Sequence, residues 1–165
     1  MKIQVGGLSD GCHDYRFHAE PSELGLSGAF STGITVTATL EKSGNQLHLA
    51  AKVETAGSFT CDRCVAPFEK RLTPSCDMHY VTDATAGDRF DPSEVQVISP
   101  AYQVIDITDD VRQTLVLAVP LKLLCREDCA GLCPKCAKNL NEGRCECKDL
   151  IVEPRWEGLR RFLDG

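Results

Sequence analysis

The chain has 165 residues, 42% of them hydrophobic and 25% charged, which is typical of one globular domain with a small appendage. Its net charge of −6 argues against a protein that coats nucleic acid indiscriminately. The start of the chain lacks the apolar core and cleavage site of a secretory signal, and the longest apolar run, Leu115 to Leu121, has seven residues. We therefore expect a cytoplasmic protein, in a bacterial or organellar interior, without a membrane contact.

The first hundred residues have the pattern of a β-rich body. Residues 34–40 and 47–53 alternate apolar and polar positions around the turn at Ser43-Gly44-Asn45, which predicts a β-hairpin. Gly57 is expected to end the second strand. Further strands are predicted at residues 68–72, 78–81 and 95–98, and residues 83–92 have the composition of a loop.

The period changes near residue 106, where a helix is predicted over residues 106–118. Ile107, Val111 and Leu115 fall four residues apart, and acidic residues occupy the first turn, where the helix dipole favours them. Asp106 or Thr108 is the expected N-cap, and Pro120 ends the helix. A short second helix is expected to begin at Pro154 near the end of the chain.

Together these patterns predict an α+β fold. It has an antiparallel β-rich body with one or two helices, followed by a zinc-ribbon-like, cysteine-rich C-terminal segment. We expect the body to span residues 1–121, with its helix near 106–118, and the zinc-binding tail to span residues 122–165. The tail carries nine Lys and Arg against eight Asp and Glu, whereas the body carries nine against sixteen.

Eight of the ten cysteines occur in four close pairs: Cys61 and Cys64, Cys125 and Cys129, Cys133 and Cys136, and Cys145 and Cys147. Spacings of this kind let one turn of backbone present two thiolates to a metal, and eight thiolates make two tetrahedral zinc sites. Iron–sulfur clusters, redox pairs and disulfides are the alternatives, but a reducing cytosol and four clustered pairs favour zinc. Cys12 and Cys76 are expected to be ordinary buried or half-buried thiols and not metal ligands.

The second half of the cysteine pattern is compact, since only eight residues separate Cys136 from Cys145. We therefore assign Cys133, Cys136, Cys145 and Cys147 to one site. The other pairs, about sixty residues apart, would share a second metal that joins the body to the tail; a different pairing across Cys129 and Cys133 is the alternative. Sites made of four cysteines are closed to substrate, so both zinc ions are expected to be structural, and the protein is expected not to be an enzyme.

With these residues identified, the chain resembles the YceD family of large ribosomal RNA subunit accumulation proteins, over residues 1 to about 162. The resemblance is carried by Cys61-Asp62-Arg63-Cys64 with Pro67-Phe68, residues 117–122, residues 125–136, Asn139-Leu140-Asn141, Cys145 with Cys147, Asp149, and Pro154-Arg155-Trp156. It implies a role in the accumulation or processing of 23S ribosomal RNA and so in large-subunit biogenesis. One departure is Ala137, where the family usually has Gly, a residue suited to a positive φ.

Two kinds of partner follow from this resemblance: ribosomal RNA, or ribosomal and assembly proteins of the large subunit. A small-molecule substrate is not expected. An adaptor that binds only proteins is the alternative, and the acidic net charge favours it. The candidate contact residues are basic: Arg63, Lys122, Arg126, Lys135, Lys138, Arg144, Lys148, Arg155, Arg160 and Arg161.

Overall fold

The computed structural model describes residues 1–26, 28–30, 32–82, 91–92, 94–99, 101 and 103–147. Its elements, in chain order, are β1 (Lys2–Gln4), β2 (Gly11–Ala19), η1 (Pro21–Leu24), β3 (Ile34–Ser43), β4 (Gln46–Thr60), β5 (Pro67–Leu72), β6 (Ser75–Val81), β7 (Val95–Val97), β8 (Val104–Asp106) and α2 (Thr108–Ala118). The predicted α+β class, rich in antiparallel strands and followed by a cysteine-rich segment, is confirmed.

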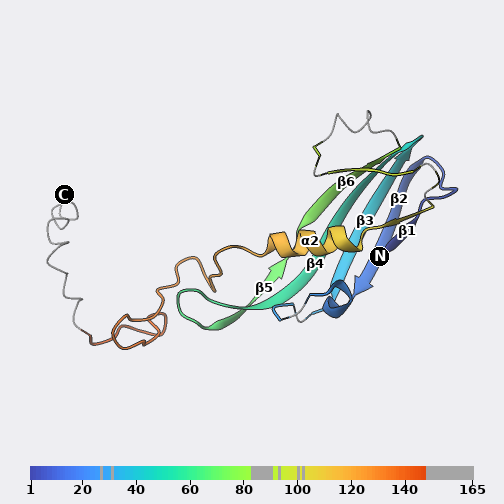
Figure 1. Ribbon diagram of the computed structural model, residues 1–165. Helices are drawn as coiled ribbons and strands as arrows, with labels where there is room; N and C mark the ends of the chain where they lie inside the picture. The colour runs from blue at the N-terminus through green and yellow to red at the C-terminus, as the bar shows by residue number, and fades with distance from the viewer. Residues whose placement is uncertain are drawn as a thin grey trace, which may run out of the picture.

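The main sheet has the strand order β2-β3-β4-β6-β7, in which only the β6–β7 pair is parallel. The predicted hairpin forms between β3 and β4, with Ser43 opposite Gln46 at the turn. The long strand β4 is the organising element of the sheet (Figure 1). Its first part pairs with β6, up to Lys52 opposite Ser75, and its second part pairs with β5, up to Thr60 opposite Pro67.

One face of this sheet is covered by α2, as Figure 1 shows. Val36 and Leu40 on β3 and Leu49 and Val53 on β4 point to the covered face and are almost completely buried, because side chains alternate between faces along a strand. From the helix, Ile107, Val111 and Leu115 have no measurable exposure, as their fourfold spacing predicted. Burying each such side chain contributes roughly 1.5–3 kcal/mol to stability.

Gly57 does not end its strand, contrary to the sequence-based expectation. β4 continues to Thr60, and Gly57 forms an isolated bridge with Phe30. A Cβ at this position would lie 2.7 Å from the Phe59 ring and 3.0 Å from the Ala29 carbonyl oxygen. Gly57 therefore permits a close backbone approach within a continuous strand.

The expected N-cap of α2 is also wrong by one residue. The helix is capped at Ile107, whose side chain cannot accept a hydrogen bond. Asp106, one residue earlier, accepts a hydrogen bond from the Thr108 backbone amide at 3.1 Å and another from the Thr108 hydroxyl at 2.5 Å. These bonds lower the pKa of Asp106. Its carboxylate therefore satisfies the backbone amide of the first helical residue, although Asp106 is not the N-cap.

Three strands were not predicted: β1, β2 and β8. β2 pairs with β3 over its whole length, from Gly11 opposite Lys42 to Ala19 opposite Ile34, whereas β1 and β8 form a separate two-stranded ribbon. The predicted C-terminal helix and most of the loop at 83–92 lie outside the described residues. Among the described helices, none combines the length and the apolar character that crossing a membrane requires.

Candidate metal centres

The first cysteine group consists of Cys61, Cys64, Cys125 and Cys129, whose sulfur atoms all lie within 4.8 Å of one another. The first pair occupies the turn between β4 and β5, and the second follows α2. The Cys61 and Cys129 sulfurs are 3.8 Å apart, and the Cys64 and Cys125 sulfurs are 3.7 Å apart. These separations exclude disulfides, whose sulfurs lie about 2.05 Å apart.

A tight backbone turn holds the first pair. The Val65 amide donates to the Cys61 carbonyl at 2.9 Å, and the Cys61 amide donates to the Ala66 carbonyl at 2.9 Å. To close this turn, Val65 adopts φ of 59°, in the left-handed region that a β-branched residue rarely occupies. The β4–β5 hairpin thus sets both thiols on one side of a rigid turn.

The segment after α2 is hydrogen-bonded to this turn. The Asp62 amide donates to the Leu123 carbonyl at 2.8 Å, and the Leu123 amide donates to the Asp62 carboxylate at 2.6 Å. Arg63 donates from its guanidinium to the Cys129 carbonyl at 2.8 Å and accepts from the Leu132 amide at its own carbonyl. These bonds place the second cysteine pair opposite the first.

The second cysteine group consists of Cys133, Cys136, Cys145 and Cys147, whose sulfur atoms also lie within 4.8 Å of one another. The predicted division of the eight cysteines therefore matches the division in space. Cys12 and Cys76 belong to neither group; Cys76 is half-buried as expected, whereas Cys12 is exposed. The first turn of the second group repeats the geometry of the first group: the Ala137 amide donates to the Cys133 carbonyl at 2.9 Å, and Ala137 has φ of 55°. The positive φ expected from the departure at this position is present.

Neither group carries four ionised thiols easily. Burial raises the pKa of Cys61, but the backbone amides of Cys125, Cys64 and Arg63 outweigh burial and lower it to about 6. The backbone amides of Cys136 and Lys135 likewise lower the pKa of Cys133 to about 6. Burial and then the neighbouring thiols raise the pKa of Cys125 to about 12. The Cys136 thiol and then burial raise the pKa of Cys147 to about 12. In both groups, a bound cation would offset the mutual repulsion of four thiolates.

The geometry fits a tetrahedral metal ion. A metal–sulfur bond of about 2.3 Å implies sulfur–sulfur edges of roughly 3.8 Å in a tetrahedron, and the two separations in the first group are 3.8 and 3.7 Å. In the second group the Cys145 and Cys133 sulfurs are 3.4 Å apart. Each group could therefore hold one metal ion, with no position left for substrate when all four thiolates bind.

Asn141, in the loop of the second group, contacts the first. Its amide nitrogen donates to the Cys129 sulfur at 3.3 Å. Its side-chain oxygen accepts from the Arg126 guanidinium at 2.7 Å and from the Ala130 amide at 2.8 Å. Sequence reasoning did not identify this residue as part of a site. The only signal in the sequence was the Asn139-Leu140-Asn141 motif, which lies between Cys136 and Cys145.

Of the ten candidate contact residues, six lie in the described part of the chain, and three of these six use their side chains within the protein. Arg63 and Arg126 donate to partners in the cysteine-rich segment, as described above, and the Lys138 ammonium donates to the Arg144 carbonyl at 3.1 Å. Lys122 and Arg144 are exposed, and no ion pair or side-chain hydrogen bond of either is found within the described ranges. Lys135 is exposed as well. Lys148, Arg155, Arg160 and Arg161 lie outside the described residues.

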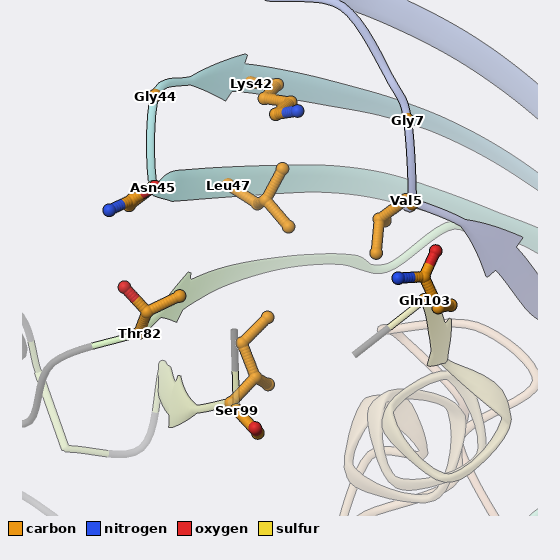
Figure 2. Close-up of a pocket in the computed structure, with 11 residues that line it drawn as sticks. Val5, Gly7, Lys42, Gly44, Asn45, Leu47, Thr82, Ser99 and Gln103 are labelled. Atoms are coloured by element: carbon orange, nitrogen blue, oxygen red, sulfur yellow. The ribbon is translucent and has the colours of Figure 1, made fainter. Parts of the chain in front are cut away.

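A pocket of about 220 Å³ lies beside the β3–β4 turn, and no residue of either cysteine group lines it (Figure 2). Its lining includes Val5, Lys42, Asn45, Leu47 and Gln103. The Lys42 ammonium donates to the Leu8 carbonyl, so it fastens the first residues of the chain to the hairpin. None of the described lining residues forms a nucleophile–base pair or a metal-ligating cluster.

Comparisons with known proteins point to one family. The family model described as "Large ribosomal RNA subunit accumulation protein YceD" matches residues 49–163, which include both cysteine groups. An uncharacterized protein of Mycobacterium tuberculosis is 31% identical across 62% of this chain and 49% of that protein, so the chain spans about half the length of this relative. No solved structure matches the chain significantly.

Two plant relatives carry the family's description in their names. The protein named large ribosomal RNA subunit accumulation protein YCED homolog 1, chloroplastic, from Arabidopsis thaliana is 35% identical across 29% of this chain and 15% of its own length. Its namesake from Zea mays is 25% identical across 82% of this chain and 58% of its own length. Because the family model covers well over half of the chain, including all eight paired cysteines, the chain belongs to the YceD family of large ribosomal RNA subunit accumulation proteins.

Proposed function

We propose that this protein is a non-catalytic factor that supports 23S ribosomal RNA accumulation or processing, and hence biogenesis of the large ribosomal subunit. The match of residues 49–163 to the family model carries this proposal. The names of the chloroplast relatives support it, and they also support a site of action inside a bacterium or an organelle. Its partners would be ribosomal RNA or the proteins of the assembling large subunit.

The two cysteine groups would each hold a structural Zn²⁺. Four thiolates in a tetrahedron are the ligand set that zinc takes in closed structural sites. Iron in a cluster uses the same ligands, so metal analysis of the purified protein tests this assignment directly. Two zinc ions per chain are expected, and iron or an absence of metal would refute it.

A zinc ion in the first group would hold the segment after α2 against the β4–β5 turn, and one in the second group would close the loop within that segment. That segment contributes few apolar side chains to a core: Leu124 and Leu132, which pack beside the first cysteine group, are only partly buried. A segment with so small a core depends on metal binding for its folding free energy. The division into a body at 1–121 and a tail at 122–165 is part of this proposal.

Exposed Lys122 and Arg144 would be the first points of contact with RNA phosphates. Each phosphate contact makes the plot of log affinity against log salt concentration steeper, because its negative slope changes by about −0.7 to −0.9 per contact. The variants Lys122→Glu and Arg144→Glu should therefore weaken binding to 23S rRNA fragments and flatten its salt dependence. A binding curve that is insensitive to both changes would remove these residues from the interface.

A protein–protein adaptor without RNA contact is the second candidate. The observation that favours it is the internal use of Arg63, Arg126 and Lys138, which are three of the six described candidate contact residues. Pull-down of ribosomal particles at several salt concentrations separates the two candidates. Loss of the particles with rising salt, together with binding to isolated RNA, supports RNA contact. Salt-resistant capture without binding to isolated RNA supports the adaptor.

The cellular role is tested by deleting the gene and comparing 23S with 16S rRNA. A fall in 23S rRNA that the native gene restores supports the proposal. The variant Cys64→Ser should fail to restore it, and the variant Cys12→Ser is the control, because Cys12 is an exposed thiol outside both groups. Unchanged 23S rRNA in the deletion strain would overturn the proposed role.

A further inference from the structure

The two cysteine groups are joined by one side chain, that of Asn141. Both of its amide hydrogens are used, one by the Cys129 sulfur at 3.3 Å and one by the Asn139 side-chain oxygen at 2.8 Å. Its oxygen accepts from Arg126 and Ala130. Since an asparagine amide offers two donors and an oxygen acceptor with two lone pairs, this side chain is fully satisfied and its orientation is fixed.

The position of Asn141 depends on the second cysteine group. It lies in the loop between Cys136 and Cys145. The start of this loop is held to the first cysteine of the group, because the Cys133 amide donates to the Lys138 carbonyl at 2.9 Å. Asn139 holds the loop by accepting from the Asn141 backbone amide at 3.1 Å. A metal bound by the second group would close this loop and so set the donor that faces Cys129.

The bond from Asn141 would in turn act on the first group. An N–H donor to a metal-ligating sulfur orients the ligand and stabilises its negative charge, and such outer partners typically affect metal affinity by 10–100-fold. The same residue reaches the first group through Arg126 and Ala130, which directly follow Cys125 and Cys129 in the sequence. Loading of either site therefore favours the arrangement that the other needs.

We propose that the two metal sites bind zinc cooperatively and that Asn141 is the positioning residue that couples them. This inference rests on the zinc sites of the proposed function. By thermodynamic linkage the coupling is reciprocal, so filling the first site strengthens the second as much as filling the second strengthens the first. The consequence is a tail that is either fully metallated or metal-free, with few chains holding one ion.

Native mass spectrometry of the full chain tests this inference, because it resolves metal-free, one-zinc and two-zinc forms. The metal-free protein receives one equivalent of Zn²⁺ under reducing conditions. Two equal and independent sites would leave about half of the chains in the one-zinc form. Cooperative loading predicts a clear minority in that form, with metal-free and two-zinc chains predominating.

The variant Asn141→Ala should raise the one-zinc form to half or more, with a 10–100-fold weaker first site in competition with a chelator. Asn141→Asp is a second variant that keeps the acceptors for Arg126 and Ala130 while removing the donor, and it should have the same effect. Asn45→Ala, in the exposed β3–β4 turn, is the matched control and should load as the native chain does.

Two results would overturn the inference: a native chain that fills one site before the other, or cooperative loading that persists unchanged in Asn141→Ala. Both differ from failure of the zinc assignment, which would appear as a purified native protein that binds no zinc at all. Circular dichroism of each variant checks that the β-rich body is folded, so that a changed distribution reports on the sites.

Discussion

Val65 and Ala137 are equivalent residues of two cysteine turns. Each follows the second cysteine of a C-x-x-C pair, and each donates its amide to the carbonyl of the first cysteine at 2.9 Å. Their φ values are 59° and 55°, and in the described chain they alone among non-glycine residues have positive φ. Both cysteine turns therefore require a left-handed backbone conformation at a residue, Val65 or Ala137, whose type rarely adopts it.

Ala137→Gly should stabilise the second metal site. Glycine reaches positive φ without the steric cost of about 1 kcal/mol that a Cβ imposes. The expected result is a several-fold gain in zinc affinity, measured by competition with a chelator. Ala130→Gly is the control, because Ala130 does not have positive φ, and there glycine should bring no gain. Equal effects at both positions would contradict the strain argument.

Gly131→Ala should weaken the first site. Gly131 has φ of 75°, and a Cβ there would lie 3.1 Å from the Arg63 carbonyl oxygen, which accepts from Leu132. Strain and crowding together should cost about 1–3 kcal/mol. Gly44→Ala is the matched control, since Gly44 has φ of 56° with open space around it. Measured zinc affinity should fall for Gly131→Ala and not for Gly44→Ala.

The variants Cys136→Ser and Cys64→Ser should differ in how much of the structure they destabilise. Cys136 lies in the local second group, so at an excess of Zn²⁺, which keeps the first group filled despite the lost coupling, its loss should release one zinc and leave the β-rich body folded. Cys64 lies in the turn after β4, so its loss should also loosen the segment after α2. Elemental analysis and hydrogen exchange provide the measurements. Faster exchange of the Asp62 and Leu123 amides is expected only in Cys64→Ser, and equal exchange in both variants would contradict it.

Tyr80→Phe should leave stability unchanged or raise it by up to about 1 kcal/mol. Tyr80 is 1% exposed, and its hydroxyl has no hydrogen-bond partner in the described part of the chain. Burial raises its pKa, as expected for a phenol removed from water. Removing an unpaired buried hydroxyl removes its desolvation cost. Urea unfolding of the zinc-loaded protein measures this effect. A loss above about 1 kcal/mol would reveal a partner for the hydroxyl.

Much of the fold could be predicted from local patterns. The alternation in residues 34–40 and 47–53 placed the β3–β4 hairpin, and the fourfold spacing of Ile107, Val111 and Leu115 identified the buried side of α2. β2 was missed because its half-buried alternation carries a weaker apolar signal at the edge of the sheet. Gly57 was misjudged because its role depends on residues 29 and 30, which approach it only in the folded protein.

The cysteine spacing alone determined the four pairs and the expectation of two four-cysteine groups, because a C-x-x-C turn is a local backbone structure. Together with the non-cysteine motifs around it, the spacing also identified the family resemblance, which the match of residues 49–163 confirmed. Only the tertiary structure decided between the assigned pairing and its alternative, since β-sheet pairing and the hydrogen bonds between Asp62 and Leu123 bring residues about sixty positions apart into contact. The same holds for Asn141: no local pattern predicts an amide donor whose acceptor is a sulfur of the other group.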